Sequence, residues 1–316
     1  MEKNGKLNLL KLAITVCLLW AVFARVDISR LKDMLKTVDI VLLAAAFAVL
    51  CAGVVLSSFR WKVLLIPQDI RISLGRAVYA YVSGMFFNSF LPTTIGGDVI
   101  RARMISPKNY HKGLAATLFE RYLGVVALAS WALFGALSAY RGGYPAAMIR
   151  MAALTSAFIL LSFFVLLTLW RREGAGQGKN YKKLPEIIRR FLSSAAVYRN
   201  FGSNVAIALL ASFMFQFLAI FCVFLITRAL RIEVGFDFVI VAATLTALFS
   251  SFPVSINGIG LREVSYVFFF SIIGISPTAA VALSFLVFTM HILASAAGGM
   301  IFLAGEGRNG IALRGG

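Results

Sequence analysis

Residues 90–103, FLPTTIGGDVIRAR, decide the fold, because proline, glycine and charge interrupt an apolar segment there. The interruption recurs 161 residues later, where four positions carry the same residue: Pro92 and Pro253, Ile95 and Ile256, Gly97 and Gly258, Arg101 and Arg262. Proline and glycine shape the backbone and arginine carries charge, so these matches indicate two copies of one unit. A broken apolar segment at corresponding positions of two halves is typical of a transporter's binding site.

The composition is that of a membrane protein. Hydrophobic residues make up 60% of the chain and the mean hydropathy is +0.88. Several apolar runs are long enough to cross a hydrocarbon core of about 30 Å. The net charge of +18 comes from Lys and Arg that mostly flank these runs, as in cytoplasmic loops facing anionic lipid. No basic domain lies outside the runs, so we do not expect nucleic acid as a partner.

The cysteines and the first apolar run carry no processing or metal signal. Cys17, Cys51 and Cys222 all lie inside apolar runs, without the spacing of a metal site or of a disulfide framework. We therefore expect neither a metal nor another cofactor. The run 9–24 lacks a small-residue cleavage pattern and continues into Arg25, which favours a retained first helix.

Apolar length and basic flanks predict the topology. The expected spans are 9–24, 40–59, 122–140, 151–170, 204–227 and a last helix from 276 to about 303. A cytoplasmic loop with Arg60, Lys62, Arg71 and Arg76 is expected after the second span. Residues 77–97 are uncharged but have basic residues on both sides, so we predict that they enter the membrane and turn back. A full crossing would place the most basic loop, 171–199, outside, against the positive-inside rule.

A second hairpin is predicted after the fifth span. Residues 238–261 are apolar but broken, and 264–275 are too short to cross alone. The predicted fold is therefore an all-α membrane domain over 1–316, with about six spanning helices and two opposed re-entrant hairpins. The hairpins belong to an inverted-topology repeat, with copies at 38–140 and 204–304. Both termini are expected in the cytoplasm.

The basic linker 171–203 carries an amphipathic pattern. Apolar residues recur there at helical spacing between Lys182, Lys183, Arg189 and Arg190. This pattern predicts a helix on the inner leaflet, bound to anionic lipid. A helix that docks a partner protein is the alternative.

Charged residues beside the breaks are the candidate site. A charge at membrane depth is costly and usually faces a cavity and a partner, and arginine can hold a phosphate bidentately. The predicted substrate-binding residues are Asp98, Arg101, Glu120, Arg121, Asn257, Arg262 and Glu263. The predicted hairpin breaks are Pro92, Gly96, Gly97, Pro253, Gly258 and Gly260. The alternatives to a binding site are interhelical salt bridges and snorkelling of long side chains to the headgroup level. Arg103 is assigned to snorkelling. His291 is assigned to packing, and a proton-linked role is the alternative for it.

Three motifs carry a resemblance to a known family. FLPTTIGGDVIRARMI, LFERYLG and SFPVSINGIGLREVSYVFFF, the last followed by SPTAAVALS, resemble the membrane domain of lysylphosphatidylglycerol synthases. That domain is the flippase part of the multiple peptide resistance factor. The resemblance covers nearly the whole chain and implies lipid translocation between leaflets of the cell (inner) membrane, with aminoacylated phosphatidylglycerol as the best-known cargo. The synthases also carry a soluble acyltransferase-like domain, and the chain is expected to be a stand-alone member without that domain.

The expected function is therefore a phospholipid flippase and not an enzyme. An integral-membrane enzyme acting on a lipid-linked substrate is one alternative. The sequence offers no metal-ligand cluster, no Ser/His/Asp set and no nucleotide loop for it, so no catalytic residue is predicted. An accessory subunit that docks a soluble synthase through the linker helix is the other alternative.

Overall fold

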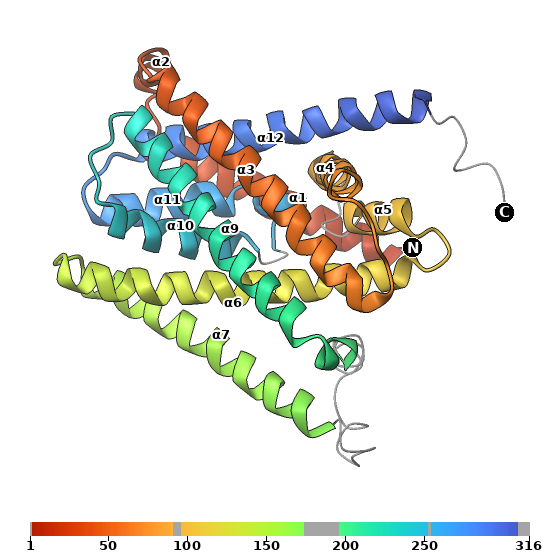
Figure 1. Ribbon diagram of the computed structural model, residues 1–316. Helices are drawn as coiled ribbons and strands as arrows, with labels where there is room; N and C mark the ends of the chain where they lie inside the picture. The colour runs from red at the N-terminus through yellow and green to blue at the C-terminus, as the bar shows by residue number, and fades with distance from the viewer. Residues whose placement is uncertain (1, 91–95, 174–195, 252–253, 309–316) are drawn as a thin grey trace. The chain divides into compact units, whose positions relative to one another are not determined.

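The computed structural model describes residues 2–90, 96–173, 196–251 and 254–308, and within these ranges the chain is all helical, without strands (Figure 1). This confirms the predicted all-α class. The helices are α1 (Glu2–Phe23), α2 (Ile28–Lys36), α3 (Ile40–Leu65), α4 (Leu74–Phe90), α5 (Gly96–Ile105), α6 (Tyr110–Arg141), α7 (Ala146–Glu173), α9 (Gly202–Ala229), α10 (Phe236–Ser250), α11 (Leu261–Ile272) and α12 (Pro277–Arg308), with short 3-10 turns η1 (Ile66–Gln68), η3 (Val197–Asn200) and η4 (Ile256–Gly258).

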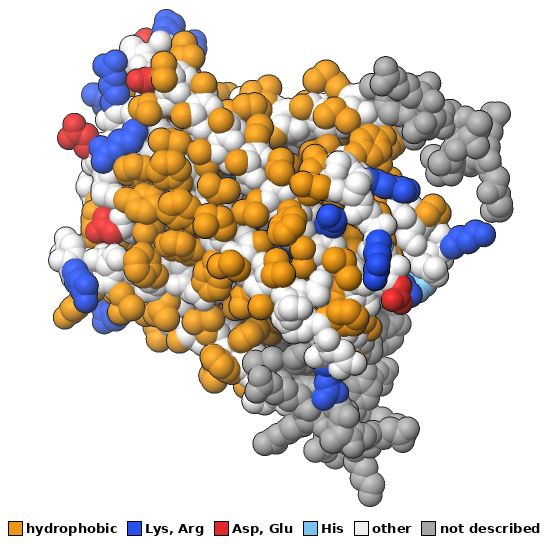
Figure 2. All heavy atoms as spheres, viewed as in Figure 1, with side chains coloured by type: hydrophobic (Ala, Val, Ile, Leu, Met, Phe, Trp, Pro, Cys, Tyr) orange, Lys and Arg blue, Asp and Glu red, His pale blue; other side chains and the backbone are white. Residues whose placement is uncertain are grey.

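Five helices in the described ranges are long and apolar enough to cross a membrane, and a sixth span results if α1 and α2, bent by 84°, count as one. The protein is thus a multi-pass membrane protein, with five or six candidate spans in the described ranges against about six predicted. Exposed apolar side chains such as Val41, Leu154 and Leu210 suit contact with acyl chains. Figure 2 shows such side chains covering most of one face.

The chain forms two compact units, each with its own apolar core. Unit 1 contains residues 1–52, 125–160 and 216–290, and unit 2 contains 53–124, 161–215 and 291–316. The core of unit 1 includes Phe238, Phe269 and Phe270, and the core of unit 2 includes Trp61 and Tyr198. Helices such as α3 and α6 contribute residues to both units, because the unit boundaries fall inside them.

Helices α4 and α5, both in unit 2, pack against each other as a hairpin. Two glycines allow the close approach: a Cβ on Gly84 would lie 2.9 Å from the carbonyl oxygen of Gly97. The amide oxygen of Asn88 accepts a hydrogen bond from the Gly97 N–H at 2.9 Å, which ties the start of α5 to the end of α4. With ten residues, α5 is about 15 Å long and too short to cross a bilayer. Its predicted re-entrant position in the membrane stays a prediction.

Helices α10 and α11 form the corresponding helix pair of unit 1. Between them, Asn257, Gly258 and Gly260 adopt left-handed φ angles of 51°, 74° and 87°. A Cβ on Gly260 would lie 2.9 Å from the Cβ of Leu18, so α1 requires glycine there. The series α3, α4, α5, α6 and the series α9, α10, α11, α12 also resemble each other. Each consists of a long helix, two shorter helices and another long helix. The repeat boundaries and their inverted topology stay predictions.

Several predicted details are wrong or lie outside the described residues. Arg60 and Lys62 are not in a loop, because α3 continues to Leu65 and buries Arg60. Helix α6 begins at Tyr110, ahead of the predicted start at 122, and α2 was not predicted. Pro92, Pro253 and most of the predicted linker helix fall outside the described residues.

Candidate functional site

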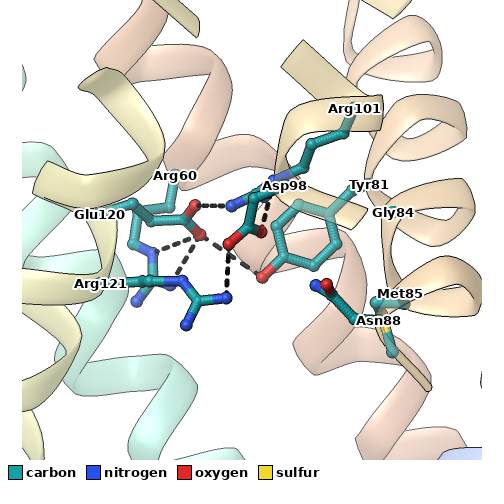
Figure 3. A pocket seen from close by; sticks show the side chains of 9 residues that line it. All are labelled: Arg60, Tyr81, Gly84, Met85, Asn88, Asp98, Arg101, Glu120 and Arg121. Atoms are coloured by element: carbon teal, nitrogen blue, oxygen red, sulfur yellow. Dashed lines mark hydrogen bonds and ion pairs between the residues drawn. The ribbon is translucent and has the colours of Figure 1, made fainter. Parts of the chain in front are cut away.

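Five charged side chains meet in unit 2, and we call them the first charge cluster. Arg60 comes from α3, Asp98 and Arg101 from α5, and Glu120 and Arg121 from α6. They line a pocket of about 190 Å³ together with four residues of α4, namely Tyr81, Gly84, Met85 and Asn88 (Figure 3). The hairpin α4–α5 thus supplies most of the pocket wall.

Glu120 is the centre of the cluster. Its Oε1 accepts hydrogen bonds from Arg60 at 2.7 Å (Nη2) and 3.3 Å (Nε), and its Oε2 accepts one from Arg101 Nη2 at 2.9 Å. The side chain is only 1% exposed. A buried carboxylate is tolerated when it is paired and hydrogen-bonded, and two arginines satisfy both oxygens here.

Asp98 extends the cluster toward its exposed side. Its Oδ1 lies 3.3 Å from Arg101 Nε, and its Oδ2 accepts a hydrogen bond from Arg121 Nη2 at 2.5 Å. Asp98 stands in the first turn of α5, where the helix dipole favours an anion. The side chain of Arg121 is 49% exposed, whereas that of Asp98 is 6% exposed. Arg121 is therefore the member of the cluster that a ligand can reach.

Aromatic rings hold the two buried arginines. The Arg101 guanidinium lies 4.7 Å from the ring centres of both Trp61 and Tyr81, within cation–π range. Arg60 lies 5.4 Å from the ring of Phe215 and donates a hydrogen bond to Ser212 Oγ at 3.1 Å. Stacking and hydrogen bonding fix both groups, so Arg60 and Arg101 hold Glu120 in one position.

A second set of polar contacts lies in unit 1. Glu263 Oε1 accepts hydrogen bonds from Arg262 Nη2 at 2.7 Å and from Ser284 Oγ at 2.9 Å. Its Oε2 accepts one from the Gly260 N–H at 2.6 Å, which satisfies the backbone at the start of α11. Arg262 also lies 4.7 Å from the ring of Phe288. This Arg262–Glu263 pair therefore braces the break between α10 and α11.

Comparison with known proteins places the chain in a family. Residues 8–299 match the model of the lysylphosphatidylglycerol synthase TM region. The chain belongs to this family. As a member of the lysylphosphatidylglycerol synthase TM region family, it is a membrane domain associated with lipid handling. No curated protein and no solved structure matches the chain.

The structure brings together some of the residues predicted for the site of this family member. Asp98, Arg101, Glu120 and Arg121 share one pocket in unit 2, whereas Arg262 and Glu263 pair with each other in unit 1. Of the predicted breaks, Gly97 stands at the α4–α5 contact, Gly96 begins α5, and Gly258 and Gly260 lie between α10 and α11. The predicted site residue Asn257 lies beside Gly258.

Arg60 is the cluster residue that the sequence reasoning missed. It was assigned to a loop because a charge follows an apolar run. The signal that the helix continues is in the next residues, since Trp61, Val63, Leu64 and Leu65 are again apolar and buried. A charge inside such a run indicates a buried partner rather than the end of the span.

Replacing Glu263 with alanine is expected to lower the stability of unit 1. The change removes the acceptor of the Gly260 N–H and leaves Arg262 and Ser284 without their shared oxygen. We expect a loss of about 1–3 kcal/mol, the cost of buried donors left unsatisfied. Thermal unfolding in detergent measures it, and Glu263→Gln, which keeps an amide oxygen, should lose less. Equal stability of Glu263→Ala and the wild type would contradict the bracing role.

Proposed function

We propose that this protein moves a phospholipid between the leaflets of the cell (inner) membrane, and that the first charge cluster contacts the headgroup phosphate. The observation that carries this proposal is a polar pocket with three arginines and two carboxylates in a membrane chain of a lipid-handling family. Charged side chains at membrane depth are costly, and a group of them facing a cavity is by default a candidate site for a polar ligand.

The chemistry of the pocket suits a phosphate. Arginine presents a planar set of donors that matches two phosphate oxygens, and Arg121 is half exposed at the pocket. Tyr81 and Asn88 line the same pocket and add neutral polar groups. The headgroup would exchange water for these donors while its acyl chains stay in the bilayer. No bond is made or broken in this process, and we propose transport, not catalysis, as the activity.

The proposal also covers orientation and partners. Both termini would lie in the cytoplasm, as the positive-inside rule predicts, and the basic linker would bind anionic lipid of the inner leaflet. A soluble synthase that co-purifies with the protein, together with no transport by the protein alone, would instead favour the accessory role.

Replacing Arg121 with glutamine is expected to slow lipid movement about tenfold or more, the effect of losing about 1.4 kcal/mol of interaction with the phosphate. The measurement uses purified protein in liposomes with acyl-labelled phosphatidylglycerol, and follows the labelled fraction accessible to a quencher that cannot cross the membrane. Arg103→Gln is the matched control, because Arg103 is an exposed arginine of α5 that is not among the pocket-lining residues. Wild-type rates in Arg121→Gln would contradict the assignment of the site, and no movement by the wild type would contradict transport of this lipid.

A further inference from the structure

Both carboxylates of the first charge cluster are already neutralised within the protein. Glu120 gives one oxygen to Arg60 and the other to Arg101. Asp98 faces Arg101 with one oxygen and Arg121 with the other. A carboxylate at membrane depth can balance a cationic headgroup when it is open to it. The contacts of these two carboxylates argue against that use.

Burial closes the carboxylates to a cation from outside. The side chains of Glu120 and Asp98 are 1% and 6% exposed. An ammonium group would have to separate an arginine from its carboxylate before it could bind either one. Separating a buried ion pair leaves an uncompensated charge in a low-dielectric site, which is strongly unfavourable.

The balance of charge in the pocket is positive. Three guanidinium groups and two carboxylates leave one net positive charge among the residues that line it. The arginine that faces outward is Arg121, which comes from α6 and is half exposed. An approaching headgroup therefore meets a cation first, with the anions behind it.

We propose that the pocket selects an anionic phospholipid, one with a phosphate and no compensating ammonium group, over a zwitterionic or cationic lipid. This inference rests on the proposed function, because it names the substrate class of the same site. The phosphate contacts Arg121, and the net positive charge of the cluster is balanced by the net negative charge of the headgroup. An added amino group, as in an aminoacylated lipid, cancels that attraction and finds no accessible carboxylate among the described residues that line the pocket.

Binding in detergent tests the inference without any need for transport. Native mass spectrometry of the purified protein compares short-chain phosphatidylglycerol, phosphatidylethanolamine and lysyl-phosphatidylglycerol, which carry one negative, no net and one positive charge. We expect phosphatidylglycerol to bind about tenfold or more tightly than the lysyl lipid, since the two lipids differ by two unit charges and each charge close to another changes an affinity severalfold even in water. Equal binding of the three lipids, or preference for the lysyl lipid, would overturn the inference.

A charge series at Arg121 sharpens the test. Arg121→Gln lowers the net charge of the cluster to zero and Arg121→Glu lowers it to minus one. The preference for phosphatidylglycerol should fall to about equality in the first variant and reverse in the second, while Arg103→Gln keeps the wild-type ratio. A ratio that stays constant along the series would show that Arg121 does not set the selectivity and would overturn the inference. Thermal unfolding of each variant confirms that the folded proteins are being compared.

Two further experiments separate this inference from binding of a soluble phosphate ester and from the proposed transport function. Glycerophosphoglycerol carries the same phosphodiester anion without acyl chains; binding as tight as that of the lipid would overturn a lipid as the ligand and assign a soluble phosphodiester instead. Liposome transport of the same three lipids then tests the proposed function. Selective binding without movement of any lipid would contradict translocation and still support the anionic site.

Discussion

Replacing Glu120 with alanine is expected to cost the protein about 3–5 kcal/mol of its stability in unit 2, the range measured when one partner of a buried ion pair is removed. The residue is paired with both Arg60 and Arg101, and neither guanidinium is exposed by more than a small fraction. Without Glu120, Arg60 keeps Ser212 as a neutral acceptor, and Arg101 keeps Asp98. Arg60 would then have no carboxylate partner, and Arg101 would share Asp98 with Arg121.

The measurement is the thermal unfolding midpoint in detergent, followed by loss of monodisperse protein on size exclusion. Glu120→Gln keeps the shape and one acceptor oxygen, so it should fall between alanine and the wild type. Arg103→Gln changes one charge on an exposed side chain and should leave the midpoint unchanged. A midpoint for Glu120→Ala within error of the wild type would mean that the ion pairs contribute nothing to the fold of unit 2.

Replacing Gly97 with alanine is expected to destabilise the α4–α5 hairpin by about 3 kcal/mol, the upper part of the range for overpacked sites. The added Cβ would overlap the backbone carbonyl oxygen of Gly84 and the amide group of Asn88. A backbone carbonyl cannot turn aside as a flexible side chain can, so α4 and α5 would have to separate. The hydrogen bond from the Gly97 N–H to Asn88 would be lost as well.

Gly75→Ala is the matched control for this change. Both glycines are the second residue of their helix, but a Cβ on Gly75 would meet no atom within 4 Å. Alanine there should be neutral or slightly stabilising, because it has the higher helix propensity. Unfolding midpoints of the two variants give the comparison directly. Equal midpoints would show that the close contact of α4 and α5 is not required.

The all-helical fold was largely predictable because the signals for it lie in short, continuous stretches of sequence. Long apolar runs specify spanning helices, and the glycine- and proline-containing stretches mark where α4 gives way to α5 and where α10 gives way to α11. Helix ends were predicted less well. Helix α6 extends beyond its apolar core to Tyr110, since a helix does not stop where hydrophobicity stops.

Four predicted site residues, Asp98, Arg101, Glu120 and Arg121, line one pocket, but the sequence did not predict how they pair. Glu120 and Arg121 are neighbours in sequence, yet one is buried between two arginines and the other is half exposed. Successive residues of a helix point in different directions, and the partner that decides between them, Arg60, lies on another helix. Charge pairs between helices depend on packing that no single segment encodes. Arg262 and Glu263, which were listed among the candidate site residues, pair with each other within unit 1.

The Arg60–Glu120 contact also has a consequence for the order in which the chain is built into the bilayer. Arg60 is synthesised 60 residues before the carboxylate that it will meet, so α3 enters the membrane with a guanidinium and no counter-ion. Arg60 lies near the C-terminal end of α3, where a long side chain can keep its charge at the headgroup level while it waits. The charge is stabilised away from the interface only when α6 inserts and brings Glu120 to it. Insertion of α6 is therefore the step that gives Arg60 of α3 its ion-pair partner. A chain that ended before α6 would leave Arg60 without this carboxylate.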